Sequence, residues 1–357
     1  MSRRRYIPGI YLEEIRNYIM KEQRIVYIDQ LKGFAILLVV AGHVLEFCLY
    51  KNNFSFLHDM IYSFHMPLFA FLSGLVFSSL TDCKLIRKKL VKQSYKLLLP
   101  FLTMGVLYSF TIRRGEDFFL QPYKLGLWYL LFLWQCYVIT DVYNIIFIPF
   151  VKRHYLWRAF ADIIWLLVVY GIAKGMMIQL SSESNGMLGT VHLFKLYPFF
   201  FIGSVLKREK ITPPIWCKCN WVVSISSMVW LLLIWNINIP PSQYPLKISL
   251  GLGMFAIIPI VYWFAKFERK IPTKVCNTLT LFGRYSLEIY MLHRFMTSTC
   301  DMSFIGNFIL TTRNWMLEFF LVLSSSLIMS WASVYAAKIL SLNKIFSYFL
   351  LGQFKFK

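Results

Sequence analysis

The sequence predicts an all-α polytopic membrane protein with about ten transmembrane helices. Of its 357 residues, 58% are hydrophobic and 18% aromatic, whereas only 15% are charged. A water-soluble globule needs a more polar surface than this composition supplies. The apolar residues also gather in runs of about 18–24 residues, which is the length that an α-helix needs to cross a bilayer.

Ten apolar runs mark the expected helices. The first follows about 24 mostly polar residues and is too long for the apolar core of a cleavable signal peptide, so we expect it to remain in the protein as a helix. The sixth run, which begins near His192, is the shortest. The expected spans are 30–50, 56–79, 94–112, 125–149, 159–179, 192–206, 221–238, 247–265, 278–298 and 315–338.

The distribution of Lys and Arg predicts the orientation. The basic residues are concentrated in alternate connections, for example at 84–96 and 266–274, whereas residues 180–191 contain none. Because positively charged connections stay in the cytoplasm, we expect both termini to be cytoplasmic and 180–191 to lie outside. The net charge of +21 is spread between apolar runs rather than along one face. Binding to nucleic acid is therefore not expected.

The chain is expected to form one membrane domain, at 25–340. A cytoplasmic segment, 1–24, precedes it, and a basic, aromatic cytoplasmic tail, 341–357, follows it. Four of the seven cysteines, at 83, 217, 219 and 276, fall on the predicted cytoplasmic side and should be reduced thiols. Cys217 and Cys219 lack the second pair of ligands that a zinc site needs, so no metal site is predicted.

The first apolar run carries ionisable residues that an anchor does not need. An ionisable side chain near the centre of a bilayer costs at least ~2.5 kcal/mol. Lys32 and His43 are eleven residues apart, so they lie within about 20° of each other on a helix and about 16 Å apart along it. Asp29 and Glu46 lie within about 40° of the same line. The pattern predicts a polar stripe, although Lys32 as an interfacial anchor and His43 as a structural histidine are the alternatives.

Two further histidines are expected at the depth of His43. His65 lies in the second run, before Pro67, and His293 lies in the ninth run, after Glu288. Counting residues from the ends of the runs places all three histidines in one layer of the membrane. Histidine titrates near neutral pH and therefore suits proton transfer. Such a chamber fits deprotonation of a hydroxyl that attacks an acyl group, or proton relay in a transporter, and the residues alone leave these two functions balanced.

Several segments resemble the bacterial integral-membrane acyltransferase 3 family. The first is Arg24-Ile-Val-Tyr-Ile-Asp-Gln-Leu-Lys-Gly-Phe-Ala-Ile-Leu-Leu-Val-Val-Ala-Gly-His43. The others, in order, are Phe64-His-Met-Pro-Leu-Phe-Ala-Phe-Leu-Ser-Gly74, Leu127-Trp-Tyr-Leu130, Tyr197-Pro-Phe-Phe-Phe-Ile-Gly-Ser204 and Gly283-Arg-Tyr-Ser-Leu-Glu-Ile-Tyr-Met-Leu-His293. The resemblance extends from Arg24 to about Leu340.

The resemblance implies a membrane-bound O-acyltransferase of the bacterial inner membrane. Members of the family transfer an acyl group, usually acetyl, from cytoplasmic acetyl-CoA to a carbohydrate hydroxyl. The expected acceptor is a unit of O-antigen, capsule or exopolysaccharide. The alternative function is a proton-coupled transporter or flippase of polysaccharide or lipid-linked sugar, and a membrane scaffold is a third possibility.

The resemblance also suggests a role for each polar residue. The family's Arg-x10-His pattern falls on Lys32 and His43, so this chain has Lys where Arg is usual, and Lys offers a point charge instead of a planar fork. We expect His43 to act as general base and Lys32 to bind CoA phosphate, although an acyl-histidine intermediate is also possible. The remaining candidates are Asp29, which would orient Lys32, Glu288 and His293, which would orient the base, and His65, Ser73 and Tyr290, which would line the acceptor pocket.

Overall fold

The computed structural model describes nine stretches of the chain. They are residues 26–51, 55–80, 82–112, 115–147, 155–210, 220–236, 239, 243–267 and 271–353. Every element of secondary structure in these stretches is helical, as the composition predicts. The predicted segment 1–24, the cysteines at 217 and 219, and the last residues of the predicted tail lie outside the described residues.

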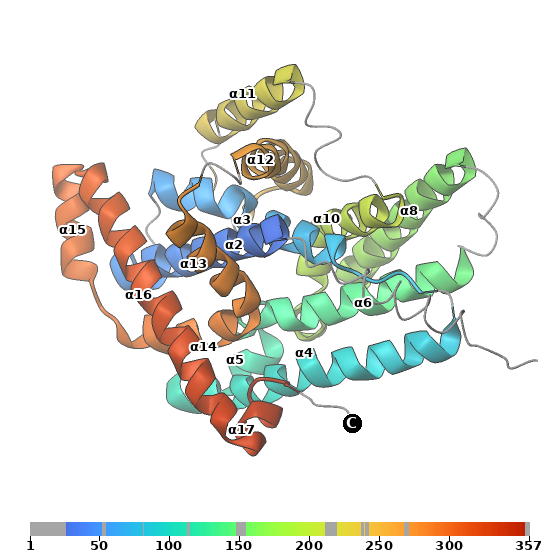
Figure 1. Cartoon of the computed structure of the whole chain (residues 1–357), viewed down its shortest axis with the longest axis horizontal. Coiled ribbons are helices and arrows are strands. Elements are labelled where there is room, and N and C mark those ends of the chain that lie inside the picture. The colour runs from blue at the N-terminus through green and yellow to red at the C-terminus, as the bar shows by residue number, and fades with distance from the viewer. Residues whose placement is uncertain are drawn as a thin grey trace, which may run out of the picture.

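The helices are numbered along the chain (Figure 1). They are α2 Val26–His43, η1 Val44–Leu49, α3 Phe56–Leu75, α4 Cys83–Ile112, α5 Gly115–Leu120, η2 Lys124–Gly126, α6 Trp128–Ile146, α8 Tyr155–Gln179, α9 Ser182–Leu188, α10 Thr190–Arg208, α11 Asn220–Asn236, α12 Leu246–Phe267, α13 Thr273–Arg284, α14 Ser286–Thr299, α15 Ser303–Thr312, α16 Trp315–Leu342 and α17 Lys344–Phe349.

Seven helical stretches among the described residues are long and apolar enough to cross a membrane. They correspond to α2 with η1, α4, α6, α8, α9 with α10, α12 and α16. Helices α3 and α11 coincide with two more of the predicted runs, but α3 carries several polar side chains and α11 is shorter. The chain is therefore a multi-pass membrane protein.

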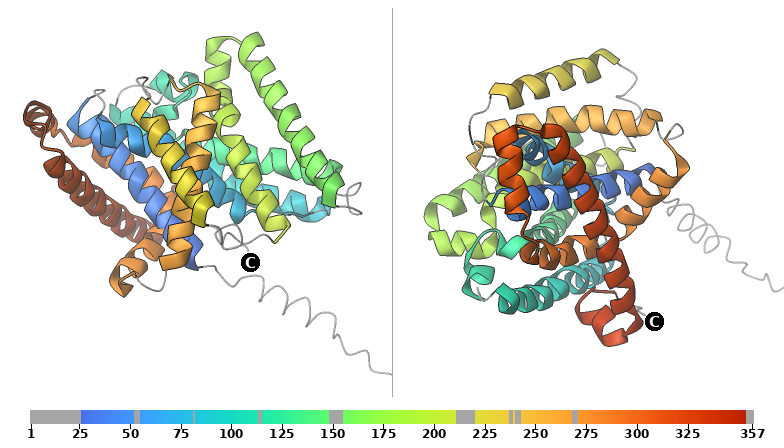
Figure 2. Two further views of the ribbon diagram at one scale, coloured as in Figure 1. Left: turned by 90° about the horizontal axis from the view of Figure 1, so that it is seen from above. Right: turned by 90° about the vertical axis from the view of Figure 1, so that its left-hand side faces the viewer.

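Helix α2 lies at the centre of the bundle. It packs against α3, α13, α14 and α16, and most of its side chains are buried. The peripheral helices α8, α11 and α16 instead carry large exposed apolar side chains, such as Trp157, Trp235 and Phe320. Figure 2 shows α11 and α12 stacked on one side of the bundle and α15 and α16 along another. Outward-facing apolar side chains suit contact with lipid, whereas α2 is shielded on most sides by protein.

Glycines bring α2 and α13 into backbone contact. A Cβ atom added at Gly33 would lie 1.9 Å from the carbonyl oxygen of Leu279, and one added at Gly283 would lie 1.9 Å from that of Asp29. Membrane helices commonly approach through small residues in this way. Two of the segments singled out in the sequence therefore meet where α13 crosses α2. Figure 1 shows α13 in front of α2.

The predicted span 278–298 is wrong as a single helix. The segment is broken at Tyr285 into α13, whose apolar residues lie on one side, and α14. Helix α13 contacts α2 through Gly33 and Gly283, and after the break α14 packs against both α2 and α16. The sequence also gave no expectation of α5, α9, α15 or α17, because each has at most ten residues and lacks a long apolar run.

Candidate functional site

His43 and His293 form a hydrogen-bonded pair. His43 Nδ1 lies 2.7 Å from His293 Nε2, and the two ring planes are 12° apart. His293 Nδ1 lies 2.8 Å from the carbonyl oxygen of Ile289, to which it must donate its hydrogen. Nε2 of a neutral His293 is then an acceptor, so His43 donates from Nδ1. The lone pair of His43 is therefore on Nε2, which is the arrangement that a proton acceptor requires.

The helix changes its winding directly after His43. Residues 44–49 form the π-helix η1, whereas α2 is α-helical up to His43. A single π-turn within a helix is frequent at functional sites. Gly42 allows the ring of Tyr62 to lie beside this turn, since a Cβ at position 42 would come within 2.7 Å of the ring. The angle predicted for Glu46 assumed α-helical winding and does not apply here.

One face of this turn is accessible. Between Val39 and Tyr50, the side chains that are not buried are those of His43, Glu46 and Phe47, whereas His293 is completely buried. The carboxylate of Glu46 accepts a hydrogen bond from the Tyr62 hydroxyl. A molecule that approaches His43 from this face therefore meets a carboxylate, a phenol and an aromatic ring as well as the imidazole.

His65 belongs to the same polar group but does not pair with His43 directly. Its Nδ1 donates to the carbonyl of Ile61, at 2.8 Å, and its ring packs edge-on against Tyr62. Tyr62 also stacks on His58, with ring centroids 4.0 Å apart. His65 and His58 both lie within electrostatic reach of His43. The predicted layer of three histidines therefore contains one direct pair and one neighbour behind Tyr62.

Arg294, which is not among the predicted site residues, places a positive charge beside the pair. Its guanidinium lies over the ring of Phe47, 4.1 Å from the centroid, and Nε donates to the carbonyl of Leu125. The side chain is buried and lies within electrostatic reach of His43. The only signal in the sequence was that Arg294 directly follows His293 inside an apolar run.

A tight turn before α6 holds α14 in place. Lys124, Leu125 and Gly126 all have positive φ, at 47°, 52° and 95°, a region that residues other than glycine adopt at a cost. The carbonyl of Leu125 accepts from Arg294, and that of Gly126 accepts from the hydroxyl of Tyr290, 2.5 Å away. The strained backbone therefore aims two acceptors at α14, within four residues of His293.

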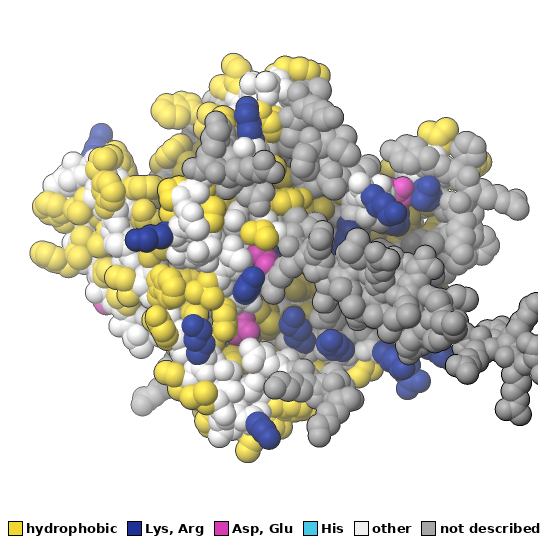
Figure 3. All heavy atoms as spheres, viewed as in Figure 1, with side chains coloured by type: hydrophobic (Ala, Val, Ile, Leu, Met, Phe, Trp, Pro, Cys, Tyr) yellow, Lys and Arg dark blue, Asp and Glu magenta, His cyan; other side chains and the backbone are white. Residues whose placement is uncertain are grey.

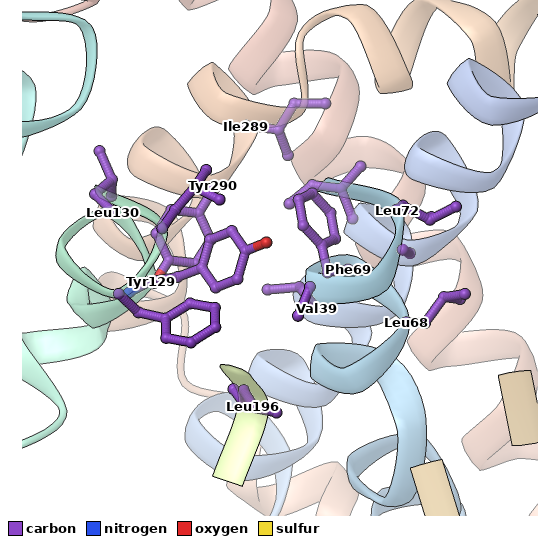
Figure 4. Close-up of a cluster of buried hydrophobic side chains, with 14 of the residues drawn as sticks. Val39, Leu68, Phe69, Leu72, Tyr129, Leu130, Leu196, Ile289 and Tyr290 are labelled. Atoms are coloured by element: carbon purple, nitrogen blue, oxygen red, sulfur yellow. The ribbon is translucent and has the colours of Figure 1, made fainter. Parts of the chain in front are cut away.

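The other end of α2 borders a cavity of about 160 Å³. It is lined by Lys32, Phe69, Ser73, Val76, Gln93, Lys96, Leu97, Tyr129, Leu133, Tyr137, Ser286, Leu287 and Tyr290. Three predicted site residues, Lys32, Ser73 and Tyr290, are thus brought together. The Ser73 hydroxyl is 3.0 Å from that of Tyr129, and the Tyr129 amide donates to the Tyr290 hydroxyl. Figure 4 shows Tyr129 and Tyr290 facing Phe69 and Leu72.

Tyr290 connects this cavity to the histidine pair. It lines the cavity, and its ring centroid lies 6.2 Å from that of His293. Lys32 and Lys96 bring two cations to the same cavity. Figure 3 shows Lys and Arg side chains gathered over α13, α14 and α4 on one face of the molecule, while the surface over α15 and α16 is largely hydrophobic. The cavity therefore combines positive charge with an aromatic wall.

Asp29 and Glu288 lie away from the histidine pair. Asp29 is buried where α13 crosses α2, three residues before Lys32. Glu288 is buried and accepts a hydrogen bond from Nε2–H of Gln353, at 3.0 Å, and it lies within electrostatic reach of Lys96. His43 is instead oriented by the hydrogen bond that it donates to His293. In the described part of the chain, no three His, Cys, Asp or Glu side chains are grouped as metal ligands.

Comparison with known proteins identifies one family. A family model described as an acyltransferase domain, that of the acyltransferase 3 family, matches residues 25–335. The match includes every residue of the histidine pair and of the cavity described above. No curated protein and no solved structure matches the chain.

Proposed function

Because the chain belongs to the acyltransferase 3 family and is a membrane-bound acyltransferase, we propose that it transfers an acetyl group from cytoplasmic acetyl-CoA to a carbohydrate hydroxyl. The acceptor is a unit of O-antigen, capsule or exopolysaccharide, or its lipid-linked precursor, at the bacterial inner membrane. The observation that carries the proposal is the hydrogen bond between His43 and His293, which leaves the lone pair of His43 on Nε2.

The donor enters from the cytoplasmic side at the cavity beside Lys32. Lys32 and Lys96 attract the phosphates of acetyl-CoA, since ammonium groups bind phosphate as point charges. Asp29 lies one helical turn before Lys32 and orients it. The thioester then lies about 16 Å further along α2, near His43, because eleven residues separate the two side chains. Ser73, Tyr129 and Tyr290 line the start of this path.

The acceptor approaches His43 from the face that carries Glu46 and Phe47. Carboxylates and aromatic rings suit a sugar, because the carboxylate accepts hydrogen bonds from hydroxyl groups and the ring packs on the apolar face of the sugar. Tyr62 holds Glu46 in place through its hydroxyl, and His65 packs behind Tyr62. This side is the partly exposed face of η1, whereas the remaining side chains of η1 are buried.

The transfer is a direct attack. Nε2 of His43 accepts the proton of the sugar hydroxyl while the oxygen attacks the thioester carbonyl. The new C–O bond forms, the C–S bond breaks, and the sulfur leaves as a thiolate that takes the proton from His43. His293 holds His43 in the required tautomer throughout. Arg294 stabilises the negative charge that develops on the carbonyl oxygen.

The experiment is an acyl-transfer assay with purified protein in lipid nanodiscs. The protein is incubated with acetyl-CoA labelled in the acetyl group and with a panel of glycans, and release of CoA thiol is measured in parallel. We expect labelled O-acetyl glycan that is lost on mild alkaline treatment, together with an equal amount of CoA thiol. Movement of a glycan or of protons across vesicles without any release of CoA thiol would replace the enzyme with a transporter.

A further inference from the structure

Two cysteines meet at the end of the bundle beyond the histidine pair. Cys48 lies in η1 and is completely buried, whereas Cys300 follows α14 and is partly exposed. The thiol of Cys48 donates to the carbonyl of Thr297, at 3.6 Å, and the backbone amide of Met302 donates to the carbonyl of Cys48, at 2.9 Å. These two bonds lie on either side of Cys300 in the chain, so residues 297–302 hold Cys300 beside Cys48.

The two cysteines lie close to the histidine pair in sequence. Cys48 is five residues after His43, and Cys300 is seven residues after His293. The neighbouring residues Lys51 and Asp301 also join the same two segments, through an exposed salt bridge of 2.7 Å. Gly306 of α15 packs on the carbonyl of Leu49. The turn after η1 and the turn after α14 are therefore already held together by several contacts.

The pattern of basic residues places this end outside the cytoplasm. Asp29 and Lys32 begin α2 at the predicted cytoplasmic surface, and Cys48 lies at the opposite end of the same helical stretch. Disulfides form and persist in the oxidising compartments outside the cytoplasm. Cys83 and Cys276 lie on the predicted cytoplasmic side, and Cys136 is buried. Among the described cysteines, Cys48 and Cys300 are therefore the close pair that lies at the predicted outer end.

We propose that Cys48 and Cys300 are the two halves of a redox-sensitive disulfide that ties η1 to the end of α14. In the oxidised protein the bond fixes the two segments that carry His43 and His293, and reduction lets them separate. The existence of the bond is independent of the proposed reaction. Its effect on turnover rests on the proposed function, because only then does the spacing of the two histidines control catalysis.

Formation of the bond needs an oxidant, which is a disulfide-bearing thiol oxidase of the extracytoplasmic compartment. The thiolate of Cys300, the more accessible of the two, attacks the disulfide of the oxidase and forms a mixed disulfide. The thiolate of Cys48 then attacks the sulfur of Cys300 and displaces the oxidase. The two cysteines lose two protons and two electrons, and the oxidase is released with both of its sulfurs reduced.

The first test measures the bond. The full chain is made with every cysteine except Cys48 and Cys300 replaced by Ala, in a host with an active disulfide-forming pathway. Membranes are treated with N-ethylmaleimide, denatured, and labelled with maleimide-polyethylene glycol before or after reduction. We expect two labels only in the sample reduced after the maleimide block, and a linked Cys48–Cys300 peptide by mass spectrometry. Cysteines that are blocked by N-ethylmaleimide, or that are labelled after denaturation without reduction, and that yield no linked peptide would overturn the proposal.

Matched variants distinguish loss of the disulfide from misfolding and from failure of the proposed function. Cys300→Ala removes the partly exposed partner and leaves the buried Cys48 in place, and a chain that keeps only Cys136 is the control for labelling. In the acyl-transfer assay, we expect reduction to lower the turnover of wild type severalfold and to leave that of Cys300→Ala unchanged. Equal sensitivity of both proteins would overturn the link to catalysis. A linked peptide in a protein that never releases CoA thiol would refute the proposed function and leave the disulfide standing.

Discussion

The two ends of α2 are surrounded in different ways. At Lys32, helices α2, α3, α4, α6 and α14 enclose an open cavity in which two lysines and several hydroxyl groups face the same space. At His43, the ring donates a hydrogen bond to His293, and the face that carries Glu46 and Phe47 remains partly accessible. A donor needs room and charge for its phosphates, whereas a general base needs a defined direction for its lone pair. In the proposed reaction, the same helix supplies both by meeting different neighbours at its two ends.

This comparison assumes that the Lys32 end of α2 faces the cytoplasm. The test of that orientation gives an all-or-none result. In a background without native cysteines, we introduce Lys88→Cys on the predicted cytoplasmic side or Ser184→Cys on the predicted outer side. An impermeant maleimide applied to intact cells should label only Ser184→Cys, because the basic residues retain their side in the cytoplasm. Labelling of Lys88→Cys alone would reverse the orientation and move donor entry to the histidine end.

The largest expected change in turnover comes from His43. A general base contributes about 10²–10⁴-fold to the rate, so His43→Ala should lower kcat by that factor. The KM for acetyl-CoA should change little, since the phosphates are held near Lys32. The control is His192→Ala, which removes another buried histidine, one that stacks on Trp128. Near-normal turnover of a well-folded His43→Ala protein would remove the general base from the mechanism.

His293 should have a smaller effect of a distinct kind. Loss of the group that orients a metal-bound histidine typically costs about 10- to 100-fold, and we expect a loss of the same order in kcat of His293→Ala. His293→Gln should recover part of the activity, because the amide oxygen can accept the hydrogen from His43 Nδ1. The measurement is the dependence of kcat on pH, which should change in His293→Ala and return toward wild type in the Gln variant. Identical pH profiles in all three proteins would make His293 a packing residue only.

Lys32 tests the other end of α2. A hydrogen bond to a charged group contributes about 1.5–3 kcal/mol, so Lys32→Ala should raise the KM for acetyl-CoA about tenfold or more with little change in kcat. Lys32→Arg should retain most of the affinity because the charge remains. Lys84→Ala, which removes an exposed cation from the start of α4, controls for general electrostatic attraction. Donor binding that is equal in wild type and Lys32→Ala would make Lys32 an interfacial anchor.

The smallest effect is expected at Glu288. Its carboxylate accepts from Gln353 rather than from either histidine. Glu288→Gln keeps a hydrogen-bonding group of the same size, so kcat should fall by no more than about threefold, in line with the small net contribution of one hydrogen bond. Acyl transfer and thermal unfolding of the purified variant are the measurements. A loss as large as that of His43→Ala would return Glu288 to the catalytic centre.

Several features of the site followed directly from spacing along the chain. The eleven-residue interval between Lys32 and His43 lies within the α-helical part of α2, so the periodicity argument applies to it. The occurrence of His293 in an apolar run indicated a polar chamber, because an ionisable group in a membrane helix needs partners. The same argument could not identify the partner, since the two histidines are far apart in sequence and meet only when α14 packs beside α2.

Other features could not be predicted from the sequence, for identifiable physical reasons. The π-turn that begins at Val44 depends on packing around η1, and no local residue preference predicts it. The break at Tyr285 lies inside an apolar run that reads as one span. The predicted tail also contains α17 and the buried Leu351, and Gln353 reaches Glu288, because this segment folds back against α4. Such contacts join residues that are far apart in the chain, so the sequence does not predict them.

The sequence by itself determined the class of the protein, the approximate place of its helices and which residues are chemically costly in a membrane. Those properties depend on composition, run length and helical period, which are local. Only the tertiary structure decided that His293 orients His43, that Lys32 borders a cavity with Ser73 and Tyr290, and that Glu288 turns toward Gln353. Directions of side chains and shapes of cavities depend on how helices pack, and packing joins segments that the sequence lists hundreds of residues apart.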